Sequence, residues 1–185
     1  MSGRYRTIVA DPPWDYGRDA ERWVPTDGNQ ADRRRIPYAA MTVDQIASLP
    51  VTDWAADSSR LFLWTTNRHL PEAFGVGSAW GFEYRQALVW HKLGAAPWGG
   101  SVAPISAEFL LTFVRGDPPV LSRWTSSVVA VARAAHSAKP DVFVDLAERT
   151  SPGPYLEMFA RRARFGWDYW GDQSLGTAEM PGEAA

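Results

Sequence analysis

The chain has 185 residues, a formal net charge of −2 and no cysteine, and 45% of its residues are hydrophobic. This length favours one domain with a substantial core, and the composition excludes a largely disordered, collagenous or coiled-coil protein. The lack of cysteine excludes disulfide bonds, a cysteine-ligated zinc site and a thiol nucleophile, and three scattered histidines give no sign of another metal site. No apolar stretch approaches the roughly 18 residues of a membrane span, and the first residues lack the apolar segment of a signal peptide, so we expect a cytoplasmic protein.

Short apolar runs alternate with helical or loop segments, a pattern typical of an α/β domain with a mostly parallel sheet. Thr42, with Gln45 three residues later, gives a capping-box signature for a helix that Pro50 ends. A second helix is predicted over residues 140–149, with proline in its first turn. Strands are predicted over residues 5–10, 61–64, 87–90, 109–114, 127–131, 155–159 and 167–170.

Two long segments, residues 15–38 and 93–106, have no clear periodicity and are expected to be functional lids or binding loops, or else disordered. The only concentrated basic run, Arg33-Arg34-Arg35, lies in the first of them. It is either a surface charge run or a site that binds phosphate groups. Residues 1–175 are predicted to form a single domain, and residues 176–185 a mobile tail.

The most informative motif is Asp11-Pro12-Pro13-Trp14, which directly follows the first predicted strand. Two further strands end in a tryptophan followed by polar residues, in Trp64-Thr65-Thr66-Asn67 and in Trp90-His91-Lys92. Ligands of parallel α/β sheets bind outside the carboxyl ends of the strands. If these strands are parallel, the three groups gather on one rim, although Trp64 and Trp90 could equally belong to the core.

The first of these motifs suits an amino group with two N–H donors, such as the exocyclic amine of adenine or cytosine. Consecutive prolines donate no backbone hydrogen bond, so the loop offers carbonyl acceptors beside one carboxylate. Asp11 and the Pro12 carbonyl would hold the amine and favour a pyramidal nitrogen. Trp14 would offer a face on which the base stacks, an interaction worth about 1–3 kcal/mol. The alternative is a turn at the end of a strand with a buried tryptophan.

From Tyr5 to Gln173 the sequence resembles the adenine-N6 methyltransferases of the family named after the 70-kilodalton subunit of the mRNA adenosine methyltransferase, which has many small bacterial and phage members. The segments that carry the resemblance occur in the family's order. They are Asp11-Pro12-Pro13-Trp14, Pro37-Tyr38, residues 61–67 (Leu-Phe-Leu-Trp-Thr-Thr-Asn), Trp90-His91-Lys92, residues 108–111, residues 136–141 (His-Ser-Ala-Lys-Pro-Asp), residues 151–153, residues 157–161 and residues 166–171.

The resemblance implies a Rossmann-like fold that uses S-adenosylmethionine (SAM), with a permuted, β-class-like motif order in which the catalytic motif precedes the cofactor strand. The implied catalytic residues are Asp11, Pro12, Pro13 and Trp14. Lys139 is placed between cofactor and substrate, and an ammonium group there could pair with the cofactor carboxylate or a phosphate. The implied cofactor residues are Lys139, Glu157, Phe159, Arg161, Gly171, Asp172 and Gln173. The candidate substrate residues are Tyr38, Trp64, Asn67, Lys92, Glu108, Arg33, Arg34 and Arg35.

These inferences predict a SAM-dependent methyltransferase that acts on the exocyclic N6 of adenine in DNA or RNA and needs no metal. The alternatives are a catalytically silent subunit that binds nucleic acid, and an amino-methyltransferase for cytosine N4 or a free nucleotide. Near-neutral charge predicts weak, salt-sensitive binding of nucleic acid by the lone chain, and therefore a homodimer or a protein partner.

Overall fold

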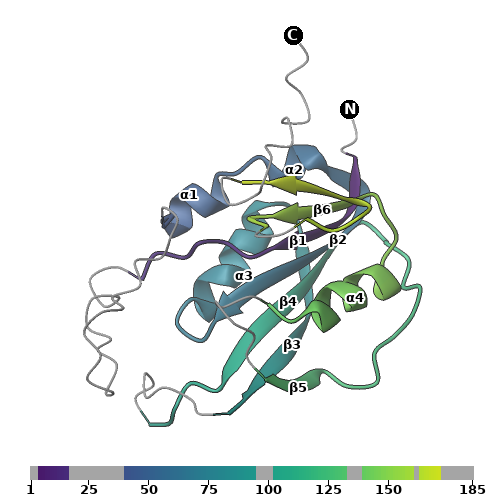
Figure 1. Ribbon diagram of the computed structural model, residues 1–185. Helices are drawn as coiled ribbons and strands as arrows, with labels where there is room; N and C mark the ends of the chain where they lie inside the picture. Colours follow the sequence, from purple (N-terminus) through teal and green to yellow (C-terminus); the bar gives the residue numbers. More distant parts are fainter. Residues whose placement is uncertain (1–3, 17–39, 95–101, 133–138, 161–162, 172–185) are drawn as a thin grey trace.

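A seven-stranded sheet organises the chain, with the strand order β5-β3-β4-β2-β1-β6-β7 (Figure 1). The structure is a computed structural model that describes residues 4–16, 40–94, 102–132, 139–160 and 163–171. Strand β4 runs antiparallel to both of its neighbours, and the remaining strand pairs are parallel. The mostly parallel sheet predicted from the sequence is therefore confirmed.

Each predicted strand is present, and three of them are longer than the sequence suggested. The bounds are β1 Tyr5–Ala10, β2 Ala55–Thr66, β3 Glu83–Leu93, β4 Ala107–Arg115, β5 Val128–Ala132, β6 Tyr155–Met158 and β7 Trp167–Trp170. Most of the additional residues at the amino ends of β2 and β3 are polar, so no apolar run marks them. Pairing with β4 extends these two strands, because β4 is hydrogen-bonded to both along its length.

Four helices accompany the sheet: α1 Val43–Ala47, α2 Val51–Trp54, α3 Leu70–Ala79 and α4 Asp141–Thr150. The predicted capping box of α1 is confirmed, because the Gln45 amide donates to Thr42 Oγ1 at 3.2 Å and the Thr42 amide donates to Gln45 Oε1 at 2.8 Å. Helix α4 begins one residue after the proline that was predicted to open it. Helix α3 was not predicted, because its two glycines and one proline are poor helix formers.

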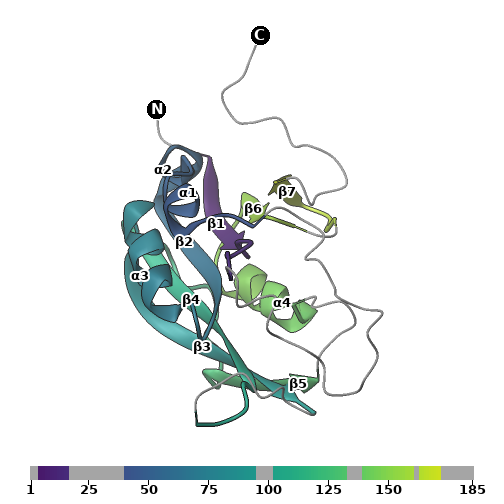
Figure 2. The same ribbon diagram turned by 90° about the vertical axis from the view of Figure 1, so that its left-hand side faces the viewer.

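The helices cover the two faces of the sheet unequally. Helices α1, α2 and α3 lie on one face, and α4 lies on the other (Figure 2). The larger core joins the three helices to inward-facing residues of β1, β2 and β4, and includes Ile46, Val51, Val76, Trp80, Leu61 and Phe113. The smaller core joins α4 to the opposite face, and includes Phe143, Leu146, Phe62, Leu88 and Leu110. One helix cannot cover a face this wide, which leaves the connections to cover the rest.

Helix α3 approaches β4 closely because it carries a glycine at the contact. A Cβ atom added at Gly77 would lie 2.3 Å from the ring of Phe113, which is fully buried in β4. Gly75, two residues earlier in the same helix, is exposed, and a Cβ there would meet nothing within 4 Å. The two glycines therefore have different roles, although both weaken the helix to a similar degree.

We expect Gly77→Ala to lower the free energy of unfolding by about 1–3 kcal/mol, because the added methyl group must displace a close-packed ring. Gly75→Ala is the matched control and should raise the free energy of unfolding by about 0.4–1 kcal/mol, since it only restricts the unfolded chain. Urea denaturation of both variants measures the difference. Equal effects of the two substitutions would contradict the packing that we describe.

Candidate active site

The strand directions bring the predicted site residues to one edge of the sheet. Asp11 follows the carboxyl end of β1, Asn67 follows that of β2, and Lys92 lies near that of β3. Because β4 runs the opposite way, its amino end reaches the same edge, and Glu108 pairs with Thr66 of β2 and Trp90 of β3. The rim that the sequence predicted on the assumption of parallel strands is therefore present, and an antiparallel strand contributes to it.

Four charged side chains of alternating sign form a continuous chain at this rim. Lys139 Nζ lies 2.9 Å from Asp11 Oδ1 and 3.2 Å from Glu108 Oε2. Lys92 Nζ binds the other carboxylate oxygen of Glu108. Lys139 Nζ also lies 5.2 Å from the centre of the Trp64 ring, within the range of a cation–π contact. We call Asp11, Lys139, Glu108 and Lys92 the charge cluster.

Burial and mutual attraction oppose each other in this cluster, and attraction prevails. Burial alone would lower the pKa of the Lys139 ammonium group, but Asp11 and Glu108 raise it above its ordinary value. Burial alone would raise the pKa of the Glu108 carboxyl group, but Lys139 and Lys92 lower it below its ordinary value. Both groups are therefore ionised at neutral pH, so Lys139 is a fixed cation there and cannot serve as a base.

Backbone hydrogen bonds hold the loop after β1 in place. The Trp14 amide donates to the Pro12 carbonyl at 2.9 Å, the Met41 amide donates to the Pro13 carbonyl at 2.9 Å, and the Asp15 amide donates to the Met41 carbonyl at 3.1 Å. A carbonyl oxygen has two lone pairs, so Pro12 keeps the capacity to accept one further hydrogen bond. The loop thus presents a fixed carbonyl acceptor next to the carboxylate of Asp11.

Trp14 does not offer a face to a base, contrary to what the sequence suggested, and Trp64 lies in the core, which is one of the two places that the sequence left open for it. Trp14 is 4% exposed, its ring stacks on His69 with centroids 5.3 Å apart, and its indole N–H donates to the Trp64 carbonyl at 3.1 Å. Trp64 is 2% exposed and meets Phe143 edge to face. The structure instead agrees with the alternative for Trp14, a buried tryptophan in a turn at the end of a strand.

Sequence reasoning overlooked two aromatic residues of the rim. His69 is buried after the end of β2, and its ring also meets the Tyr16 ring edge to face at 4.9 Å. The Tyr16 hydroxyl lies 3.0 Å from Thr66 Oγ1, and burial raises the pKa of Tyr16. Burial lowers the pKa of His69, which favours the neutral imidazole. The position of His69 just after a strand that ends at the rim indicates a rim residue, whereas the histidines are considered above only as metal ligands.

The candidate cofactor residues that the structure describes adjoin the charge cluster. The Asp11 amide donates to the Met158 carbonyl at 3.3 Å, which joins the end of β1 to the end of β6. Phe159 follows with a φ of 65°, and its amide donates to the Trp170 carbonyl at 2.6 Å. Gly171 has a φ of +117°, and a Cβ there would lie 3.2 Å from Phe159 Cα. A non-glycine residue in the left-handed region is uncommon and is found disproportionately at functional sites.

The remaining predicted site residues divide into described and undescribed ones. Asn67 is exposed after β2, and Glu157 is half-buried in β6. Seven predicted site residues lie outside the described ranges, as does the predicted tail: Arg33, Arg34, Arg35, Tyr38, Arg161, Asp172 and Gln173. In the described part of the chain no three His, Asp or Glu side chains gather to hold a metal ion. None of the four described helices is long and apolar enough to span a membrane.

Comparison with known proteins identifies relatives of two kinds. The Type II methyltransferase M.MunI of Mycoplasma sp is 33% identical over 181 residues, which cover 91% of this chain and 77% of that protein. The N(6)-adenosine-methyltransferase MT-A70-like protein of Drosophila melanogaster is 29% identical over 167 residues, covering 86% of this chain and 25% of that protein. The N(6)-adenosine-methyltransferase catalytic subunit METTL3 of Homo sapiens is 28% identical over 169 residues, covering 86% of this chain and 26% of that protein.

The chain thus corresponds to most of the bacterial relative and to about a quarter of these eukaryotic relatives. The sequence profile of the MT-A70 family matches residues 5–173, from the first residue of β1 to beyond the end of β7. Since that match includes all seven strands and the whole charge cluster, the chain belongs to the MT-A70 family of methyltransferases.

Proposed function

We propose that this chain transfers the methyl group of SAM to the exocyclic N6 of adenine in DNA or RNA. The observation that carries the proposal is the pair of acceptors at the end of β1, the Asp11 carboxylate and the Pro12 carbonyl, beside the buried cation of Lys139. The relatives are named for methyltransferase activity, and those from fly and human are named for N(6)-adenosine. An N6 amine offers two N–H donors and needs two such acceptors.

Lys139 fixes the position of the carboxylate that meets the amine. Its ammonium group lies 2.9 Å from Asp11 Oδ1 and is itself held by Glu108 and by the Trp64 ring. A carboxylate has about four lone-pair positions, so an ion pair with lysine leaves room for an N–H donor. Attraction between charges is stronger in a partly dry site than in water, and this keeps the arrangement in place before substrate arrives.

The backbone after β6 and β7 suits a ligand that approaches the main chain closely, and we propose that SAM binds there. Phe159 and Gly171 both have positive φ values, and a Cβ atom added at Gly171 would lie only 3.2 Å from Phe159 Cα. The link from the Asp11 amide to the Met158 carbonyl places this backbone next to the amine acceptors. Bound SAM would supply an electrophilic methyl group on its sulfonium sulfur.

The residues of the rim then act chiefly by positioning. Asp11 and Pro12 would orient the amine so that its lone pair points along the line of transfer, and alignment of reactants is a major source of rate enhancement. The N6 nitrogen must lose a proton when its new bond to carbon forms, and Asp11 is the anionic acceptor closest to that N–H. Trp14 contributes indirectly, because its buried ring and its hydrogen bond to the Trp64 carbonyl hold the loop in place.

We expect Asp11→Asn to reduce methyl transfer by at least about 100-fold, because an amide presents a donor where the amine needs an acceptor. The unfolding temperature should also fall, because the Lys139 ammonium group loses one of its two carboxylate partners, so transfer is compared at a temperature at which both proteins are folded. Asp53→Asn is the matched control, since Asp53 is exposed in α2, which precedes the amino end of β2. Transfer is measured with isotopically labelled SAM on DNA and RNA, followed by mass spectrometry of the nucleosides. Near-native activity of Asp11→Asn, or label on a base other than adenine, would refute the proposal.

Glu108 should make a pH-dependent contribution to stability, which Glu108→Gln removes. The pKa of this carboxyl group is lower in the folded protein than its ordinary value of 4.5, so the ionised form stabilises the fold. The contribution is fully present above about pH 5, and it disappears as the pH falls through the lowered pKa.

Thermal unfolding of both proteins at several pH values tests this expectation. The unfolding temperature of the wild-type protein should exceed that of Glu108→Gln at pH 7, and the difference should shrink toward about pH 3. Glu72→Gln, an exposed change in the first turn of α3, is the control. A difference between wild type and Glu108→Gln that stays constant with pH would show that the ion pairs do not stabilise the fold.

A further inference from the structure

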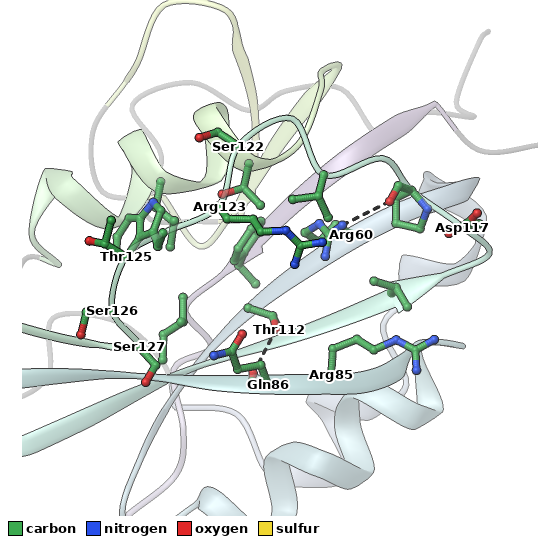
Figure 3. Close-up of a pocket in the computed structure, with 18 of the residues that line it drawn as sticks. Arg60, Arg85, Gln86, Thr112, Asp117, Ser122, Arg123, Thr125, Ser126 and Ser127 are labelled. Carbon is green, nitrogen blue, oxygen red and sulfur yellow. Dashed lines mark hydrogen bonds between the residues drawn. The ribbon is translucent and has the colours of Figure 1, made fainter.

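A cavity of about 530 Å³ lies on the α4 face of the sheet (Figure 3). Strands β2, β3 and β4 form its floor, and the connection from β4 to β5, residues 116–127, forms its wall together with the end of α4. Along β4 the cavity is lined by Thr112 and Val114, and Thr112 lies four residues, about 13 Å, from Glu108 at the active-site rim. The cavity is therefore a second site.

The cavity exists because α4 covers only part of this face. The connection over residues 116–127 contains no helix or strand, and hydrogen bonds hold it over the sheet at three points. The Leu121 amide donates to the Thr150 carbonyl at 2.8 Å, and Arg60 Nη2 donates to the Pro118 carbonyl at 3.3 Å. At its end, the Ser127 carbonyl accepts from the Val89 amide of β3 at 2.8 Å. An extended segment fixed at these three points spans the floor without filling the space beneath it.

Three buried polar atoms of the lining residues have no hydrogen-bond partner among the described residues. They are Arg60 Nε, Trp124 Nε1 and Thr150 Oγ1. Buried polar groups are nearly always hydrogen-bonded, so each exception calls for an explanation. The first two are donors only. A ligand that satisfies both must therefore present acceptor atoms.

The charges of the lining indicate that this ligand is an anion. Arg60, Arg85 and Arg123 line the cavity with a single carboxylate, that of Asp117, in a chain of formal net charge −2. Arg85 pairs with Glu83, but Arg60 is only 8% exposed and forms no ion pair with any described residue. Burial, together with the positive charge of Arg85, lowers the pKa of Arg60. Figure 3 shows the side chain of Arg123 extending from the connection in the direction of Arg60.

We propose that this cavity binds a phosphate-bearing ligand of mononucleotide size, with Arg60 and Arg123 holding the phosphate. The planar guanidinium group matches the spacing of phosphate oxygens and binds them through paired hydrogen bonds. Hydroxyl groups of Ser122, Thr125, Ser126 and Ser127 line the same space and suit a sugar. The volume lies within the range of about 300–1,000 Å³ that is usual for small-molecule sites. The phosphate comes from a free nucleotide or from a polynucleotide.

The test is calorimetric titration of the full chain with adenosine monophosphate, with adenosine, and with a short oligothymidylate. Adenosine monophosphate should bind the wild-type protein, and adenosine should not. Arg123→Gln should weaken binding at least about tenfold, because a charged hydrogen-bond donor is lost. Arg149→Gln is the matched control, since Arg149 is exposed in the last turn of α4 and does not line the cavity. Its affinity should equal that of the wild type.

Arg60→Met tests the proposal from the floor of the cavity, and it also removes the hydrogen bond of Arg60 to the Pro118 carbonyl. Methionine keeps an unbranched aliphatic chain and removes the charge, so ligand binding should be lost while the unfolding temperature of the ligand-free protein is unchanged or raised. Arg-dependent binding of the oligothymidylate alone would assign the phosphate to a polynucleotide and would still support the site.

Three outcomes overturn the inference: no binding of either phosphate probe, equal losses in Arg123→Gln and Arg149→Gln, or displacement of adenosine monophosphate by S-adenosylhomocysteine. The last would place the nucleotide in the proposed cofactor site. No methyl donor is present in these titrations, so the inference does not depend on the proposed methyl transfer.

Discussion

The ion pairs of Lys139 are the interactions on which the active-site rim depends. This buried ammonium group joins the end of β1, through Asp11, to the beginning of β4, through Glu108. Removal of one partner would leave a buried charge without compensation, which costs far more than an exposed ion pair contributes. Glu108 reaches the cluster only because β4 reverses direction in an otherwise parallel sheet. The ion pairs of the site therefore depend on the direction of β4 in the sheet.

Two buried tryptophans, Trp14 and Trp64, pack against the residues of the charge cluster or the loop that carries them. Trp14 donates its indole hydrogen bond to the Trp64 carbonyl, and the Trp64 ring lies beneath the Lys139 ammonium group. Large aromatic side chains bury much apolar surface while their N–H groups still find partners, so they make a rigid base for charged groups. Part of the unusual content of ten tryptophans thus serves to position Asp11 and Lys139, and the stacking of bases is not needed to explain Trp14 or Trp64.

The sequence was sufficient for the existence of the strands and for the charged residues of the rim, but not for its aromatic residues His69 and Tyr16. Apolar runs marked all seven strands, and polar residues after β1, β2 and β3 marked the rim. It did not reveal the reversal of β4, which depends on pairing with distant strands, or helix α3, whose Gly77 is required by contact with Phe113. The burial of Trp14 was also hidden, since it results from His69, which lies more than fifty residues away.

Two largely buried cations, Lys139 just before α4 and Arg60 in β2, show how the fold distributes its ligand sites. Lys139 lies between two carboxylates of the chain, so its charge is compensated before any ligand arrives. Arg60 lies in β2, beneath the connection over residues 116–127, and the described residues supply only a carbonyl acceptor for its guanidinium group. A buried charge without an opposite charge beside it is costly. A bound anion would therefore lower the free energy more at Arg60 than at Lys139. The charge of Lys139 is compensated by carboxylates of the chain, whereas the charge of Arg60 would be compensated by a bound anion.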